Sequence, residues 1–132
     1  MSAPGSAART FRLDGSYTAI NRLYQERGWT DGLPIVPPTD GDVREFLRFT
    51  DRDPRDVIAV LPPRQGEATV ERVAVNAVMA GCRPEYLPVV ITAIEALADP
   101  VFNLDSIQAT THPVAPFMIV NGPIARELEI NA

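Results

Sequence analysis

Two residue types that can carry reaction chemistry each occur once in this sequence, as Cys82 and His112. Cys82 follows Gly81, precedes Arg83 and lies just before a predicted helix. A neighbouring cation and a helix N-terminus both favour the thiolate form of cysteine. We therefore predict Cys82 as a catalytic nucleophile, with a buried cysteine that only packs as the alternative.

His112 belongs to a small polar cluster with Thr110 and Thr111. Imidazole is the side chain best suited to proton transfer near neutral pH, so we predict His112 as a catalytic general acid or base. Pro113 fits the alternative equally, an ordinary loop with a hydrogen-bonded histidine. No Ser-His-Asp order accompanies it.

Two connections could bind an anionic substrate. Residues 64–69 join a predicted strand to a predicted helix, whose free N–H groups attract anions, and Arg64 adds a guanidinium. One glycine and no lysine favour a carboxylate over a nucleotide. We predict Arg64 and Thr69 as substrate-binding residues, with a plain strand-helix connection as the alternative.

Two asparagines complete the predicted substrate site. Asn121 precedes Gly122 and Pro123, where a second strand gives way to a helix, although Asn-Gly also suits a simple turn. Asn76 lies on a largely apolar helix, where its amide either reaches a site or finds a structural partner.

Composition excludes several classes of site and of protein. One cysteine forms no internal disulfide and no paired zinc motif, and one histidine builds no metal site alone, so the sequence shows no metal motif. The many carboxylates leave an oxygen-ligand site as the alternative, and no particular cofactor is predicted. The net charge of -5, without a basic cluster, argues against nucleic-acid binding. Short apolar runs and the missing signal core argue against membrane insertion and predict a cytoplasmic protein.

Periodicity and capping residues predict a mixed α/β chain. Residues 1–10 are expected to form a mobile N-terminal arm, and residues 11–132 one domain. Helices are predicted at 16–27, 39–49, 69–80, 88–98 and 124–128, and strands at 57–61, 106–111 and 117–120, the first buried on both faces. Residues 29–39 are expected to form an extended loop, in which 29–34 make a pocket wall or a docking surface.

The predicted sheet is too small to stand alone. Two or three strands with four or five helices leave sheet edges and faces uncovered, and the chain ends soon after a strand-turn-helix pattern. We therefore expect a second polypeptide to complete the domain, through a split gene or through cleavage of a precursor after Ala132.

Five ordered strings resemble a little-characterised bacterial family, the UGSC-associated thiol or selenothiol proteins. They are WTDGLP (29–34), ATVE (68–71), NAVMAGCRPEY (76–86), QATT (108–111) and NGPIA (121–125). The resemblance extends from about Tyr17 onward and covers the N-terminal part of longer members. It implies no established reaction, and any redox pair it implies lies on another chain, because a Cys-Gly-Ser-Cys string is absent here.

These observations predict the small subunit of a heteromeric enzyme that acts on a small carboxylate-bearing organic molecule, with thiol or histidine chemistry at the subunit interface. The alternative is a non-catalytic structural or regulatory subunit that stabilises a catalytic partner. A free-standing ligand-binding module is a third hypothesis.

Overall fold

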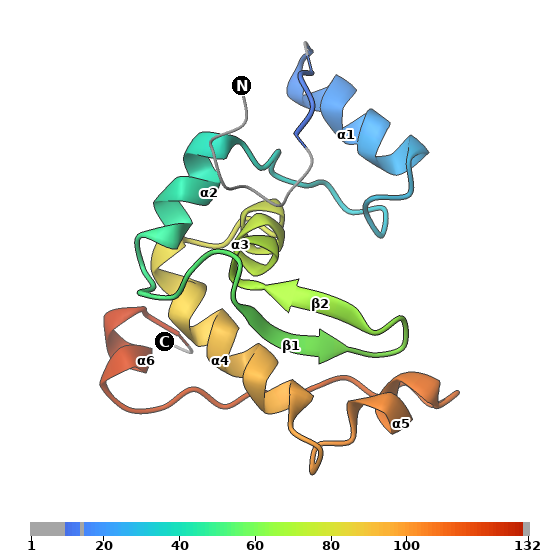
Figure 1. Ribbon diagram of the computed structural model, residues 1–132. Coiled ribbons are helices and arrows are strands. Elements are labelled where there is room, and N and C mark those ends of the chain that lie inside the picture. The colour runs from blue at the N-terminus through green and yellow to red at the C-terminus, as the bar shows by residue number, and fades with distance from the viewer. Residues whose placement is uncertain (1–9, 14, 131–132) are drawn as a thin grey trace.

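A computed structural model describes residues 10–13 and 15–130, so the predicted N-terminal arm falls almost wholly outside the described residues. Within this part the chain forms a two-stranded antiparallel sheet and six α-helices, which confirms the mixed α/β class with a small sheet (Figure 1). The elements are α1 (Tyr17–Glu26), α2 (Asp40–Leu47), β1 (Val57–Leu61), β2 (Gly66–Thr69), α3 (Val70–Met79), the 3-10 helix η1 (Pro84–Tyr86), α4 (Leu87–Ala98), α5 (Leu104–Ala109) and α6 (Pro123–Glu127).

Local signals set the ends of the first three helices. Ser16, Thr39 and Thr69 are N-caps, and each hydroxyl accepts a bond of 3.2–3.3 Å from a backbone amide three residues later. Gly28 and Gly81 follow α1 and α3 with φ of 62° and 75°, a left-handed conformation that suits glycine. The predicted starts of these three helices and the stops of α1 and α3 are therefore confirmed, whereas α2 ends at Leu47, before the predicted Phe49.

The hairpin differs from the sequence prediction in two ways. Residues 66–69, predicted as part of a loop and a helix cap, form β2 because they pair with β1, with Leu61 opposite Gly66 and Val57 opposite Thr69. Strand β1 is not buried on both faces, since Val57 and Val60 are 49% and 50% exposed. Helix α4 packs against β1, and no third strand joins this sheet in the described part of the chain.

Two predicted strands are wrong. Residues 104–109 form helix α5, so the strand expected at 106–111 is absent. Residues 113–120, which include the strand expected at 117–120, run without helix, turn or bend, but they pair with no strand. Figure 1 shows this stretch as the long connection between α5 and α6. Residues 117–120 therefore have the sequence pattern of a strand, but no described strand pairs with them.

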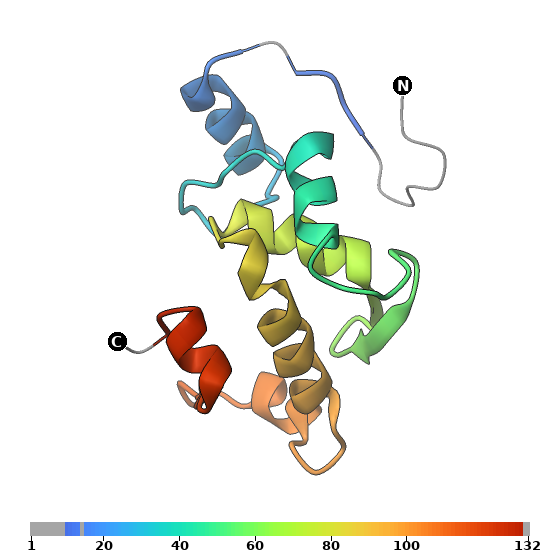
Figure 2. The same ribbon diagram turned by 90° about the vertical axis from the view of Figure 1, so that its left-hand side faces the viewer.

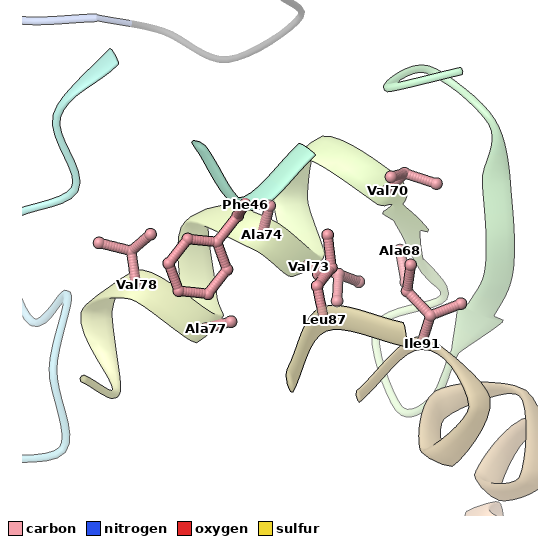
Figure 3. Close-up of a cluster of buried hydrophobic side chains, with 9 residues drawn as sticks. All are labelled: Phe46, Ala68, Val70, Val73, Ala74, Ala77, Val78, Leu87 and Ile91. Carbon is pink, nitrogen blue, oxygen red and sulfur yellow. The ribbon is translucent and has the colours of Figure 1, made fainter. Parts of the chain in front are cut away.

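The core forms around α3, whose apolar residues recur every three or four positions. Val70, Val73, Ala74, Ala77 and Val78 are at most 5% exposed. Helices α2 and α4 pack on α3, as the two views in Figures 1 and 2 show. Figure 3 shows the resulting cluster, which also contains Phe46, Ala68, Leu87 and Ile91.

Candidate functional site

Cys82 is half-buried and packs against the core cluster. Its backbone amide donates to the Ala77 carbonyl oxygen at 3.0 Å, and burial raises the pKa of its thiol. The guanidinium of Arg83 lies 3.5 Å from Glu85 and 3.6 Å from Glu129, so two carboxylates share its charge. These surroundings oppose the thiolate that the sequence predicted.

Two predicted substrate residues bind the backbone of α3. The buried Thr69 accepts from the Arg72 amide through its hydroxyl at 3.3 Å. The amide nitrogen of Asn76 donates to the Arg72 carbonyl oxygen at 2.8 Å. Both side chains thus have a satisfied structural role, the alternative considered for Asn76.

Arg64 lies exposed in the hairpin turn. The sequence placed it between a strand and a helix N-terminus, and this context is wrong because β2 intervenes before α3 begins at Val70. The pairing of β2 with β1 therefore separates Arg64 from the free N–H groups of the helix.

His112 and Asn121 flank an exposed apolar stretch. We call residues 113–120 the apolar segment. The His112 carbonyl accepts from the Val114 amide at 2.9 Å, its own amide donates to the Thr110 hydroxyl at 3.2 Å, and both His112 and Asn121 are exposed. Between them, Phe117 and Ile119 are 86% and 73% exposed.

A groove with a volume of about 1060 Å³ opens between residues 10–13, α1, α2 and α3. Its aromatic wall consists of Phe11, Tyr24 and Trp29, whose ring centroids are 5.7 Å apart for Phe11 and Trp29 and 5.4 Å apart for Tyr24 and Trp29. Burial raises the pKa of the Tyr24 phenol. Trp29 thus forms part of a pocket wall, one of the two roles considered for residues 29–34. Among the predicted site residues, Asn76 also lies on this wall.

Three arginines, which the sequence interpretation missed, line the groove: Arg12, Arg27 and Arg44. They come from three separate parts of the chain, so the sequence contains no local cluster that would indicate them. The Arg27 guanidinium lies 5.4 Å from the centre of the Trp29 ring.

Asn21 positions one side of the groove. Its side-chain oxygen accepts from the Ile35 amide at 2.7 Å, and its nitrogen donates to the carbonyl oxygens of Ile35 and Tyr17 at 3.2 and 3.1 Å. The side chain is thus a polar clasp between α1 and the following loop, and it is 9% exposed. The signal for it was available, because Asn21 falls four residues after Tyr17 and beside Ile20 on the predicted apolar face.

The described residues contain no cluster of three or more histidine, cysteine, aspartate or glutamate side chains suited to hold a metal ion. None of the helices in that part of the chain combines the length and apolar content needed to cross a membrane. Comparison with known proteins gives no match to a family model, a curated protein or a solved structure.

Proposed function

We propose that this chain is the small subunit of a heteromeric enzyme that acts on a small carboxylate-bearing molecule, with its active site at the contact with a second polypeptide. The observation that carries the proposal is the apolar segment. Phe117, Met118 and Ile119 are 86%, 60% and 73% exposed, although they are consecutive and wholly apolar. Exposed apolar surface of this kind marks interaction sites.

The backbone of the apolar segment supports a strand-like contact. In the described residues, the amides and carbonyls of 115–120 take part in no hydrogen bond with the protein. Successive side chains of a strand point to opposite faces, so Phe117, Met118 and Ile119 present apolar groups on both faces. That pattern is typical of strands covered on both sides. The partner proposed here therefore offers a sheet edge to this segment.

The ends of the segment supply the proposed chemistry. A partner that covers residues 113–120 would approach His112 at one end and Asn121 at the other. Covering them lowers the local dielectric and strengthens their polar interactions with a substrate. In this proposal His112 transfers a proton and Asn121 orients the substrate. Cys82 is the weaker candidate for this chemistry, because burial raises the pKa of its thiol.

The partner contact can be tested with a double variant, Phe117→Asp with Ile119→Asp. Two carboxylates in the segment should remove the second polypeptide from the native complex, as seen by intact-mass spectrometry, because burying unpaired charges is costly. Val101→Asp is the matched control, since Val101 is 94% exposed in a turn outside the segment. A wild-type chain that purifies alone, folded and active, would exclude a heteromeric enzyme.

A second candidate function is a non-catalytic subunit that stabilises a catalytic partner. The local bonds of Thr69 and Asn76 and the core packing of Cys82 favour it, because these polar groups are used within the chain. His112→Ala and Asn121→Ala in the assembled complex separate the two candidates. Loss of turnover with intact assembly supports the enzyme subunit, and retained turnover supports the structural subunit.

The proposal extends to family and location. The five ordered sequence strings support membership of the UGSC-associated proteins, and the composition supports a cytoplasmic protein. A thiol pair is then expected on the second polypeptide. Alkylation of the reduced native complex should add two labels to the partner, and cell fractionation should place both chains in the cytoplasm.

A further inference from the structure

Among the described residues that line the groove between residues 10–13, α1, α2 and α3, positively charged side chains outnumber negatively charged ones, although the chain is acidic. Arg12, Arg27 and Arg44 line it, against the two carboxylates Asp40 and Glu71. The whole chain has a net charge of -5, so a wall with three guanidinium groups and two carboxylates departs from the average surface.

These guanidinium groups are available to a ligand. No carboxylate of the described residues lies within ion-pair distance of Arg12, Arg27 or Arg44. All three side chains belong to exposed residues. Asp40 lies in the first turn of α2, where the helix dipole stabilises its negative charge. The arginines therefore offer donors that a carboxylate accepts, in the paired geometry that guanidinium favours.

The rest of the groove is suited to an apolar body. The aromatic wall of Phe11, Tyr24 and Trp29 is joined by aliphatic side chains from α1, α2 and α3, among them Leu23, Leu47 and Met79. The volume of about 1060 Å³ lies just above the range of roughly 300–1,000 Å³ that ligand pockets usually span.

We infer that this groove binds an amphipathic carboxylate, a molecule with an apolar body against the aromatic wall and one anionic end at the arginines. Charge complementarity selects this occupant over a neutral or cationic one. The inference stands on the groove alone, so a chain that proves to be a non-catalytic subunit still binds the ligand.

The experiment uses the full chain, together with any polypeptide that co-purifies with it, and dodecanoate as the probe below its micellar concentration. Trp29 is the only tryptophan of this chain and lies on the groove wall. Subtracting the emission of a Trp29→Phe preparation isolates its fluorescence. Dodecanoate should change that emission saturably, and dodecanol and dodecyltrimethylammonium should bind at least tenfold more weakly.

Arg44→Gln tests the anionic end. Loss of a charged hydrogen bond should weaken dodecanoate by about tenfold and leave dodecanol unchanged. Arg48→Gln is the matched control on the end of the same helix, because Arg48 does not line the groove. Circular dichroism verifies that both variants fold.

Three results would overturn the inference. The first is equal binding of dodecanoate, dodecanol and dodecyltrimethylammonium. The second is equal dodecanoate affinity of Arg44→Gln and wild type. Either of these two would show that the groove recognises only the apolar body and not the carboxylate. A groove that admits no probe because a co-purified polypeptide covers Trp29 would identify a protein segment as its occupant. Each of these results leaves the proposed enzyme subunit to be judged separately, by assembly and turnover.

Discussion

The core around α3 and the apolar segment use the same residue types but differ completely in exposure. Phe46 is 4% exposed in the core, whereas Phe117 is 86% exposed in the segment. Leu87 is fully buried, and Ile119 is 73% exposed. Apolar character alone therefore does not bury a side chain. Burial depends on covering elements, which α2 and α4 provide for α3 and no described element provides for residues 117–119.

The largest expected effect is the difference in the free energy of unfolding between variants of Phe46 and of Phe117. Phe46→Ala should lower the free energy of unfolding by about 3–5 kcal/mol, because it removes apolar contacts and leaves a cavity. Phe117→Ala should change it by less than about 0.5 kcal/mol in the isolated chain, because the side chain is already in water. Urea denaturation followed by circular dichroism measures both. Equal losses would show that the segment packs on the chain in solution.

Asn21 tests whether a polar clasp can hold an element as firmly as apolar packing does. Asn21→Ala removes three hydrogen bonds at a buried position and should lower the free energy of unfolding by about 2–3 kcal/mol. The same urea titration measures it, with the exposed neighbour substitution Arg22→Ala as control. An unchanged midpoint would mean that α1 contributes little to global stability.

A smaller loss is expected at Thr69, where the hairpin meets the core. Thr69→Ala removes the N-cap of α3 and should lower the free energy of unfolding by about 1 kcal/mol, whereas Thr69→Ser should retain most of it. If Thr69→Ala instead weakened substrate turnover in the complex without any loss of stability, the substrate-binding role predicted from sequence would regain support.

The smallest effect concerns Cys82 at the edge of the core. Burial raises the pKa of its thiol above the usual 9.0, so the unfolded chain ionises first as the pH rises. The thiol therefore contributes its stability below pH 9.0 and loses it as the pH passes its higher folded value. Iodoacetamide should modify the native thiol more slowly at pH 8 than it modifies the urea-unfolded chain. Faster modification of the native chain would indicate an activated nucleophile.

The sequence predicted best what is encoded locally. Ser16, Thr39 and Thr69 mark helix starts because capping involves only a few consecutive residues. Strand β2 was missed because Gly66-Glu67-Ala68-Thr69 has no strand pattern of its own, and its pairing with β1 makes it a strand. The apolar residues 117–120 have the pattern but lack a partner strand in the described fold.

The same difference between local and tertiary information applies to the candidate site. Cys82 and His112 were identifiable as single reactive residue types, but the packing that raises the pKa of the Cys82 thiol is tertiary. Arg12, Arg27 and Arg44 were missed because residues spread over more than 30 positions of the sequence form one groove wall only after α1 and α2 are placed. No local spacing indicates that assembly.

The clasp at Asn21 has a consequence for how the loop after α1 can vary. The amides of the consecutive residues Ile35 and Val36 bind different helices, Asn21 of α1 and the Met79 carbonyl oxygen of α3. These two hydrogen bonds attach the loop to both α1 and α3, so the length of the loop matters more than the identity of its residues. We expect both amides to exchange slowly with deuterated solvent despite lying outside any helix or strand. A residue inserted between Ile35 and Val36 would move one of their two amides away from its acceptor and release one of the two helices.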